Sequence, residues 1–123
     1  ALFRYAPGKW SVKEVLQHLI DTERIMCYRA LRFARKDKTP LPGFEENDYA
    51  PASMADNRSM VSLLQEFAAV RHATIMLFES FTDDMIARTG TGNGKEISVN
   101  ALGFIIVGHE LHHMKLFKEK YLI

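Results

Sequence analysis

Two of the five histidines, His109 and His113, lie four residues apart near the end of the chain. Apolar residues recur at three- and four-residue steps around them, so a helix would carry both imidazoles on its buried face. Such a pair aims two ring nitrogens at one point, which is the geometry of metal ligands. A buried imidazole is costly without a partner, so we expect the pair to bind a metal; the alternative is two core histidines that are hydrogen-bonded separately.

A third ligand must come from upstream, and His18 is the natural candidate. It lies roughly 10 Å from the start of a first predicted helix, and His113 lies roughly 14 Å before the end of the last one. If these helices are antiparallel, the three imidazoles lie at nearly the same level. Glu23 is closer to the middle of the apolar stripe, so it is a further candidate, either as a ligand or as a carboxylate that accepts a ligand's N–H.

Residues 109–113 also fit the H-E-x-x-H pattern, in which Glu110 would be the general base of a zinc protease. Those proteases take a third ligand downstream of the motif, and the residues that follow here include no His and a single carboxylate, Glu119. We therefore do not expect a protease. The other two histidines, His72 and His112, are predicted to lie at the surface or at the rim of the site.

The predicted elements are three long helices, over residues 11–35, 56–81 and 98–123, without a convincing strand between them. The first begins with a capping box, Ser11 to Glu14, and each helix carries one apolar face. Thr82 is expected to cap a short extra turn, and residues 90–94 are expected to form an irregular turn. The fold class is therefore all-α.

About twenty residues, 36–56, join the first two helices and contain three prolines. A loop of that length without secondary structure is usually a crossover, a lid or a binding segment. Three long helices leave one side of a bundle open. We expect that side to be covered by an upstream helix, whose tail would be residues 1–5, or by a second copy of the chain.

The composition predicts one domain, residues 1–123, with a formal net charge of +1. This charge excludes a strongly cationic nucleic-acid or membrane-surface protein, and no apolar run is long enough to span a bilayer. A single cysteine, Cys27, excludes an internal disulfide and fits a reducing cytoplasm. We expect Cys27 to be a small core residue rather than a nucleophile.

Basic residues close the first predicted helix: Arg29, Arg32, Arg35, Lys36 and Lys38. Positive charge is favourable at that end of a helix without any partner, and exposed aromatic residues are not interleaved with it. We therefore predict no nucleic-acid partner.

The sequence resembles the DinB/YfiT-like superfamily over nearly its whole length. The motifs that carry this resemblance are W-S-x-K-E-V-x-x-H-L-I-D-x-E at residues 10–23 and G-H-x-x-x-H at residues 108–113. The resemblance implies an up-down-down-up four-helix bundle whose divalent metal is held by His18, His109 and His113. The family's first helix is absent from this sequence, so we expect it to be truncated or missing.

Some members of this family are metal-dependent thiol S-transferases that use low-molecular-weight thiols, and others hydrolyse or isomerise small molecules. We therefore expect a cytoplasmic, homodimeric enzyme with a zinc or nickel ion and a small-molecule substrate, a low-molecular-weight thiol being one candidate. Phe44, Tyr49 or nearby acidic residues are expected at the mouth of the site. The alternative is a non-catalytic metal-binding or structural bundle that dimerises. No catalytic acid or base is identified.

Overall fold

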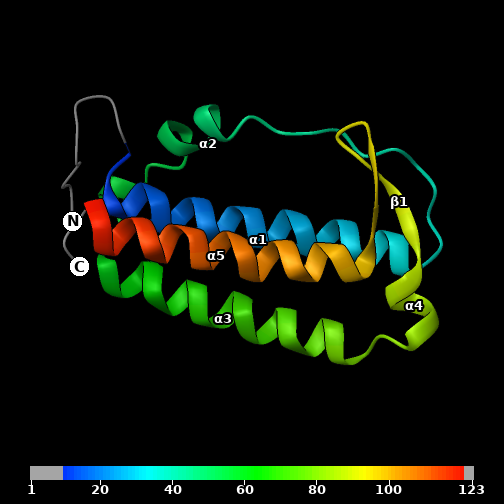
Figure 1. Ribbon diagram of the computed structural model, residues 1–123. Coiled ribbons are helices and arrows are strands. Elements are labelled where there is room, and N and C mark those ends of the chain that lie inside the picture. Colours follow the sequence, from blue (N-terminus) through cyan, green and yellow to red (C-terminus); the bar gives the residue numbers. More distant parts are fainter. Residues whose placement is uncertain (1–9, 121–123) are drawn as a thin grey trace.

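The computed structural model describes residues 10–120, which form long helices, shorter helical segments and a β-hairpin (Figure 1). The elements in chain order are α1 (Val12–Ala34), α2 (Glu46–Ala52), the 3-10 turn η1 (Ala55–Asn57), α3 (Met60–Glu79), α4 (Asp83–Ala87), β1 (Thr89–Gly92), β2 (Lys95–Ser98) and α5 (Val99–Lys120). The all-α prediction is confirmed, with the hairpin as a small addition. Residues 1–5, predicted to be the tail of an upstream helix, lie outside the described residues.

The central element is α1, which packs against both α3 and α5. In Figure 1, α1 and α3 run in the same direction and α5 runs back along them. The long connection between α1 and α3 allows this parallel pair, because a short loop would force them to be antiparallel. The antiparallel arrangement of α1 and α5, on which the predicted histidine site depends, is therefore present.

Side-chain caps fix where the long helices begin. The Ser11 hydroxyl accepts from the Glu14 amide at 3.1 Å, and the Ser11 amide donates to the Glu14 carboxylate at 2.9 Å, as the predicted capping box requires. The Ser59 hydroxyl accepts from the Ser62 amide at the start of α3, and the Ser98 hydroxyl accepts from the Ala101 amide at the start of α5. Once the first residue of a helix is set, the period of 3.6 residues determines which side chains share one side of that helix.

The crossover between α1 and α3 is more ordered than the sequence analysis expected. We predicted no secondary structure there, but α2 and η1 form within it. Glu46 and Asp48 stand in the first turn of α2, where negative charge suits the helix dipole, and Pro51 is near its end. Because prolines usually interrupt helices, the three prolines of the crossover did not indicate this short helix.

The prediction of an irregular turn over residues 90–94 was wrong. β1 and β2 pair antiparallel with Gly92 opposite Lys95, so Asn93 and Gly94 form a two-residue turn. Both turn residues have positive φ, 52° and 77°, as a type I′ turn needs. Asn-Gly is the commonest sequence for this turn, so a local signal was available and was missed.

The hairpin holds the crossover against α1. The Leu41 amide donates to the Thr91 carbonyl at 2.9 Å, and the Asn93 amide donates to the Leu41 carbonyl at 2.9 Å. Gly90 lies on the Phe33 ring so closely that a Cβ there would be 2.1 Å from a ring carbon. Glycine is therefore required for the hairpin to close this end of the bundle.

The core has two apolar clusters with a polar layer between them. One cluster joins the first half of α1 to the start of α3 and the end of α5, and the other joins the end of α1 to the start of α5. Between them lies Glu23, which is 4% exposed. Its carboxylate accepts from Arg71 Nε at 3.0 Å, from Arg71 Nη2 at 2.9 Å and from Thr74 Oγ1 at 2.6 Å. Arg71 also contacts Glu110 at 2.6 Å, so one guanidinium links α1, α3 and α5.

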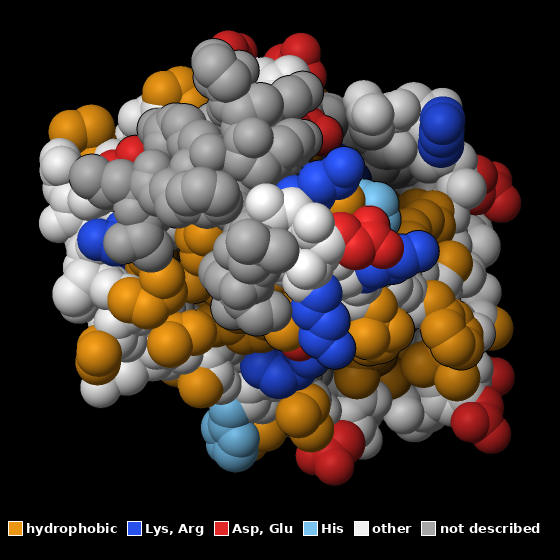
Figure 2. Space-filling model, turned by 60° about the vertical axis from the view of Figure 1, so that its left-hand side comes forward, with side chains coloured by type: hydrophobic (Ala, Val, Ile, Leu, Met, Phe, Trp, Pro, Cys, Tyr) orange, Lys and Arg blue, Asp and Glu red, His pale blue; other side chains and the backbone are white. Residues whose placement is uncertain are grey.

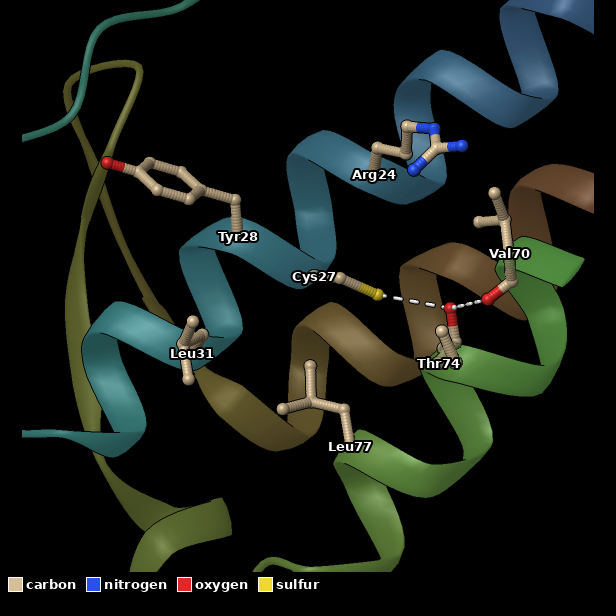
Figure 3. A pocket seen from close by; sticks show the side chains of 8 residues that line it. Arg24, Cys27, Tyr28, Leu31, Val70, Thr74 and Leu77 are labelled. Carbon is tan, nitrogen blue, oxygen red and sulfur yellow. Dashed lines mark hydrogen bonds between the residues drawn. The ribbon is translucent and has the colours of Figure 1, made fainter.

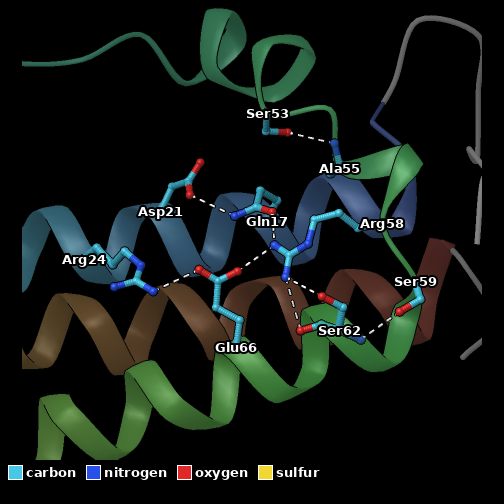
Figure 4. Close-up of polar contacts among 9 residues, drawn as sticks. All are labelled: Gln17, Asp21, Arg24, Ser53, Ala55, Arg58, Ser59, Ser62 and Glu66. Carbon is cyan, nitrogen blue, oxygen red and sulfur yellow. Dashed lines mark hydrogen bonds and ion pairs between the residues drawn. The ribbon is translucent and has the colours of Figure 1, made fainter.

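A second polar network lies closer to solvent, between α1 and the beginning of α3 (Figure 4). Glu66 accepts from both Arg24 and Arg58, at 2.9 and 2.6 Å. Arg58 also donates to Gln17, whose amide in turn donates to Asp21. These pairs are partly exposed, so each contributes less than a buried pair would.

One face of α5 carries large apolar side chains that no described residue covers: Phe104, Val107, Leu111 and Met114, which are 43–73% exposed. Hydrophobic side chains also lie open on the face shown in Figure 2, interspersed with Lys and Arg. An open side of this kind was predicted from the three long helices. Within residues 10–120, no helix combines the length and apolar character that crossing a bilayer would need.

Removal of the central guanidinium should destabilise the fold strongly. We expect Arg71→Ala to lower the free energy of unfolding by about 3–5 kcal/mol, because it leaves the Glu23 carboxylate buried without its cation. Arg24→Ala, which breaks an exposed pair with Glu66, is the matched control and should cost about 0–1 kcal/mol. Urea unfolding followed by circular dichroism measures both values, and equal losses would contradict the central role of Arg71.

Candidate metal centre

Three imidazoles converge where α1 and α5 lie antiparallel. His18 Nε2 is 2.9 Å from His109 Nε2, which is 3.1 Å from His113 Nε2. All three ligand atoms lie within 4.8 Å of one another. Nitrogens bound tetrahedrally to one zinc ion would be roughly 3.4 Å apart. The structure thus brings together the three residues that the sequence analysis selected, with the same nitrogen of each ring facing inward.

Neighbouring side chains hold His18 in this orientation. The Trp10 ring packs at 4.8 Å between centroids, and Thr22 Oγ1 lies 3.4 Å from His18 Nδ1. If Nε2 binds a metal, Nδ1 carries the proton and donates to the Thr22 hydroxyl, an outer contact typical of metal-bound histidines. Glu23 was a candidate for a ligand or for this outer contact, but the structure places its carboxylate away from the histidines. Glu23 is about 140° around α1 from His18, at 3.6 residues per turn, and its carboxylate binds Arg71.

The half-buried environment keeps the three imidazoles neutral. Burial, followed by the neighbouring imidazole charges, lowers the pKa of His18, His109 and His113 from 6.5 to about 4. Only a neutral imidazole offers a lone pair to a metal, so the residues are ready to bind one at neutral pH. Among the described residues no carboxylate or thiolate joins the cluster. Three neutral nitrogen donors without a fourth protein ligand fit a divalent ion that keeps an open position.

A cavity of about 260 Å³ opens beside the cluster. His18 and His109 line one end of it, and the crossover contributes Phe44 and Glu46 to its wall. The negative charge of Glu46 acts to raise the pKa of both His18 and His109, against the larger effect of burial. Acidic residues and Phe44 were expected at this mouth, but the sequence did not single out Glu46, because no motif or helical spacing connects it with the histidines.

Glu110, another acidic residue considered in the sequence, does not line the histidine cavity. Glu110, the general base of a protease in the H-E-x-x-H interpretation, forms an ion pair with Arg71. His72 and His112 are exposed, as predicted. Tyr49, the other aromatic residue expected at the mouth, lines a neighbouring cavity rather than this one.

Cys27 lies on the other side of α1, in a cavity between α1 and α3 (Figure 3). Its thiol is 3.2 Å from the Thr74 hydroxyl. Burial raises the pKa of the thiol, and the contact with Thr74 has a smaller, opposite effect. The thiol therefore stays protonated at neutral pH, which agrees with a packing role. It is half-buried, so it is less enclosed than a core residue would be.

Most of the basic residues at the end of α1 have contacts within the fold. Arg32 pairs with Asp37 at 2.7 Å, Lys38 donates to the Thr89 carbonyl, and Arg29 donates to the Pro42 carbonyl. Three of the five basic residues therefore contact the fold itself, and the absence of a nucleic-acid partner stays a prediction.

The lowered histidine pKa values predict how stability depends on pH. We expect the free energy of unfolding of the metal-free protein to fall as the pH is lowered from about 6.5 to about 4. In this range the unfolded chain binds protons at the three histidines and the folded chain does not, so stability rises with pH. Urea unfolding in EDTA at several pH values measures the slope. His113→Ala should make the slope shallower, whereas the exposed His72→Ala should not.

Comparisons with known proteins identify the family of this chain and a structure with the same fold. A family model described as the DinB superfamily matches residues 1–117. A solved structure, YfiT from Bacillus subtilis, superposes with a TM-score of 0.79 at 18% sequence identity, over 96% of this chain and 71% of that chain. YfiT is described as a probable metal-dependent hydrolase with an unusual four-helix bundle topology, and its likeness here shows the fold. No curated protein matches this chain significantly. On the match of the family model, the chain belongs to the DinB superfamily.

Proposed function

We propose that this protein is a metal-dependent enzyme that acts on a small molecule, by hydrolysis or by thiol S-transfer, at His18, His109 and His113. The observation that carries the proposal is the set of three neutral Nε2 atoms facing one another beside a cavity. YfiT, which shares the fold, is named a probable metal-dependent hydrolase. All-nitrogen ligands suit zinc or nickel. We further propose that the reaction takes place in the cytoplasm.

His18, His109 and His113 would hold the divalent ion, which would supply a Lewis acid that makes a water or a thiol more acidic. The chain must then provide a proton acceptor and a dry, shaped surface. Glu46 is the carboxylate that lines the cavity beside His18 and His109, so we assign it the role of proton acceptor. Met26, Phe44 and Ile105 form the apolar part of the cavity wall.

The alternative is a structural metal site that only ties helices together. A closed site would need a fourth protein ligand, and Glu23 was the candidate for it. Because the Glu23 carboxylate is occupied by Arg71 and Thr74, the geometry favours a site open to a substrate. Homodimerisation stays a prediction, with which the exposed apolar residues of α5 are compatible.

Metal content tests the site before any substrate is known. We expect the purified protein to bind about one zinc or nickel ion per chain, because three ligands converge on one point. His18→Ala and His113→Ala should lose this metal, while His72→Ala and His112→Ala, which change exposed imidazoles, should keep it. Elemental analysis of the five proteins gives the answer. Unchanged metal content in His113→Ala would rule out the proposed site.

The role of Glu46 is tested by removing its charge. We expect Glu46→Gln to keep its metal and to lose about 10²–10⁴-fold in kcat, the range typical of a removed general base. Suitable assays are hydrolysis of p-nitrophenyl acetate and transfer of a small thiol to monochlorobimane, both calculated per bound metal. Glu45→Gln changes the neighbouring carboxylate, which does not line the cavity, and should leave either rate unchanged. Equal rates in the two variants would remove Glu46 from the mechanism.

A further inference from the structure

A buried arginine without a carboxylate partner lies at the far end of the histidine cavity. Arg29 is 8% exposed, and its Nη2 donates to the Pro42 carbonyl at 2.9 Å. No carboxylate among residues 10–120 forms an ion pair with it, in contrast to Arg24, Arg32 and Arg71. Arginine is rarely buried without a counter-ion, because its charge loses hydration that one carbonyl restores only in part.

The surroundings of Arg29 keep the guanidinium next to open space. The side chain passes Gly92, where an added Cβ would lie 3.3 Å from Arg29 Cδ. It lines the histidine cavity and also a second cavity of about 350 Å³ under the crossover. The buried charge is therefore located where a ligand in either cavity could reach it.

The cavity has a polarity along α1. His18, Thr22, Met26 and Arg29 recur at three- and four-residue steps, so one face of α1 forms its floor. Along the helix axis, the Cα atoms of His18 and Arg29 are about 16 Å apart at roughly 1.5 Å per residue. Glu46 lines the cavity with the histidines, and its negative charge acts on His18 and His109. A ligand with one anionic end would therefore place that end at Arg29 and its neutral end at the histidines.

The charge available at Arg29 suits a monoanion. The nearest arginine along α1, Arg32, is paired with Asp37 at 2.7 Å, so it adds no uncompensated charge. A single guanidinium matches a carboxylate well, whereas a phosphate dianion usually recruits several cations or backbone amides. Met26 and Ile105 between the two ends favour an apolar linker.

We propose that Arg29 binds the carboxylate of the substrate, so that the enzyme acts on a small carboxylic acid whose reactive group faces the three histidines across an apolar linker. This proposal rests on the proposed metal-dependent function. It defines the substrate class of that site and makes Arg29 its specificity-determining residue.

Binding of matched thiols to the cobalt-loaded protein tests the proposal without an enzymatic assay. Cobalt(II) replaces zinc, and a thiol that reaches the metal produces a sulfur-to-cobalt charge-transfer band whose titration gives Kd. The probes are 6-mercaptohexanoate, 6-mercaptohexanol and 6-mercaptohexylphosphonate. We expect the carboxylate to bind about 10- to 100-fold more tightly than the alcohol, the range expected for a charge-assisted hydrogen bond. Equal affinities of the carboxylate and the alcohol, or tighter binding of the phosphonate than of the carboxylate, would overturn the proposal.

Variants then assign the preference to Arg29. Arg29→Gln removes the charge while keeping a donor for the Pro42 carbonyl, and it should abolish the preference for the carboxylate. Arg29→Lys keeps a charge and should retain part of the preference, so it serves if Arg29→Gln fails to fold. Arg35→Gln changes an exposed arginine at the end of the same helix and should bind the probes as the parent protein does. A full preference in Arg29→Gln would overturn the assignment.

The outcomes distinguish a failure of the proposed metal-dependent function from a failure of the carboxylate assignment. Absence of bound cobalt, or cobalt that gives no band with any thiol, contradicts the proposed function and with it this inference. Cobalt that gives the same band and the same Kd with the carboxylate and the alcohol contradicts the carboxylate assignment alone and leaves the metal site standing.

Discussion

The structure depends on one buried carboxylate, Glu23, and on the guanidinium that neutralises it. Burial of a carboxylate is tolerated only when its charge and its lone pairs are satisfied, and Arg71 and Thr74 do both from α3. The contact of Arg71 with Glu110 extends this constraint to α5. The network adds a directional requirement to the apolar packing, because the Arg71 guanidinium must meet carboxylates from α1 and α5 at the same time. It lies between the two apolar clusters.

That rotation has a consequence on the opposite side of α1. When Glu110 faces Arg71, the helical spacing of α5 directs His109 and His113 toward His18. The polar network and the histidine cluster are thus two results of the same helix packing, and they use different faces of α1. This separation explains why none of the charged residues of the network supplies a metal ligand.

The crossover and the hairpin complete the site from outside the helices. Backbone hydrogen bonds between Leu41 and the hairpin fix the crossover over α1, and α2 then presents Glu46 to the cavity. The close contact of Gly90 with Phe33 makes the position of the hairpin, and so of the crossover, depend on the core. Loops commonly carry functional residues because a rigid scaffold can hold them without constraining their sequence. Phe44 and Glu46 line the cavity from the crossover, at and just before the start of α2, whereas residues of α1 form its floor.

The sequence by itself determined what is local. The capping box at Ser11, the apolar faces of the long helices and the four-residue spacing of His109 and His113 follow from backbone hydrogen bonding and helical periodicity, so they could be predicted. The Asn-Gly turn was also local and was missed. Only the tertiary structure decided which partner each carboxylate takes: Glu23 and Glu110 bind Arg71, and Glu46 lines the cavity. These contacts join residues far apart in the chain, and their choice depends on the rotation of packed helices, which no spacing in the sequence encodes.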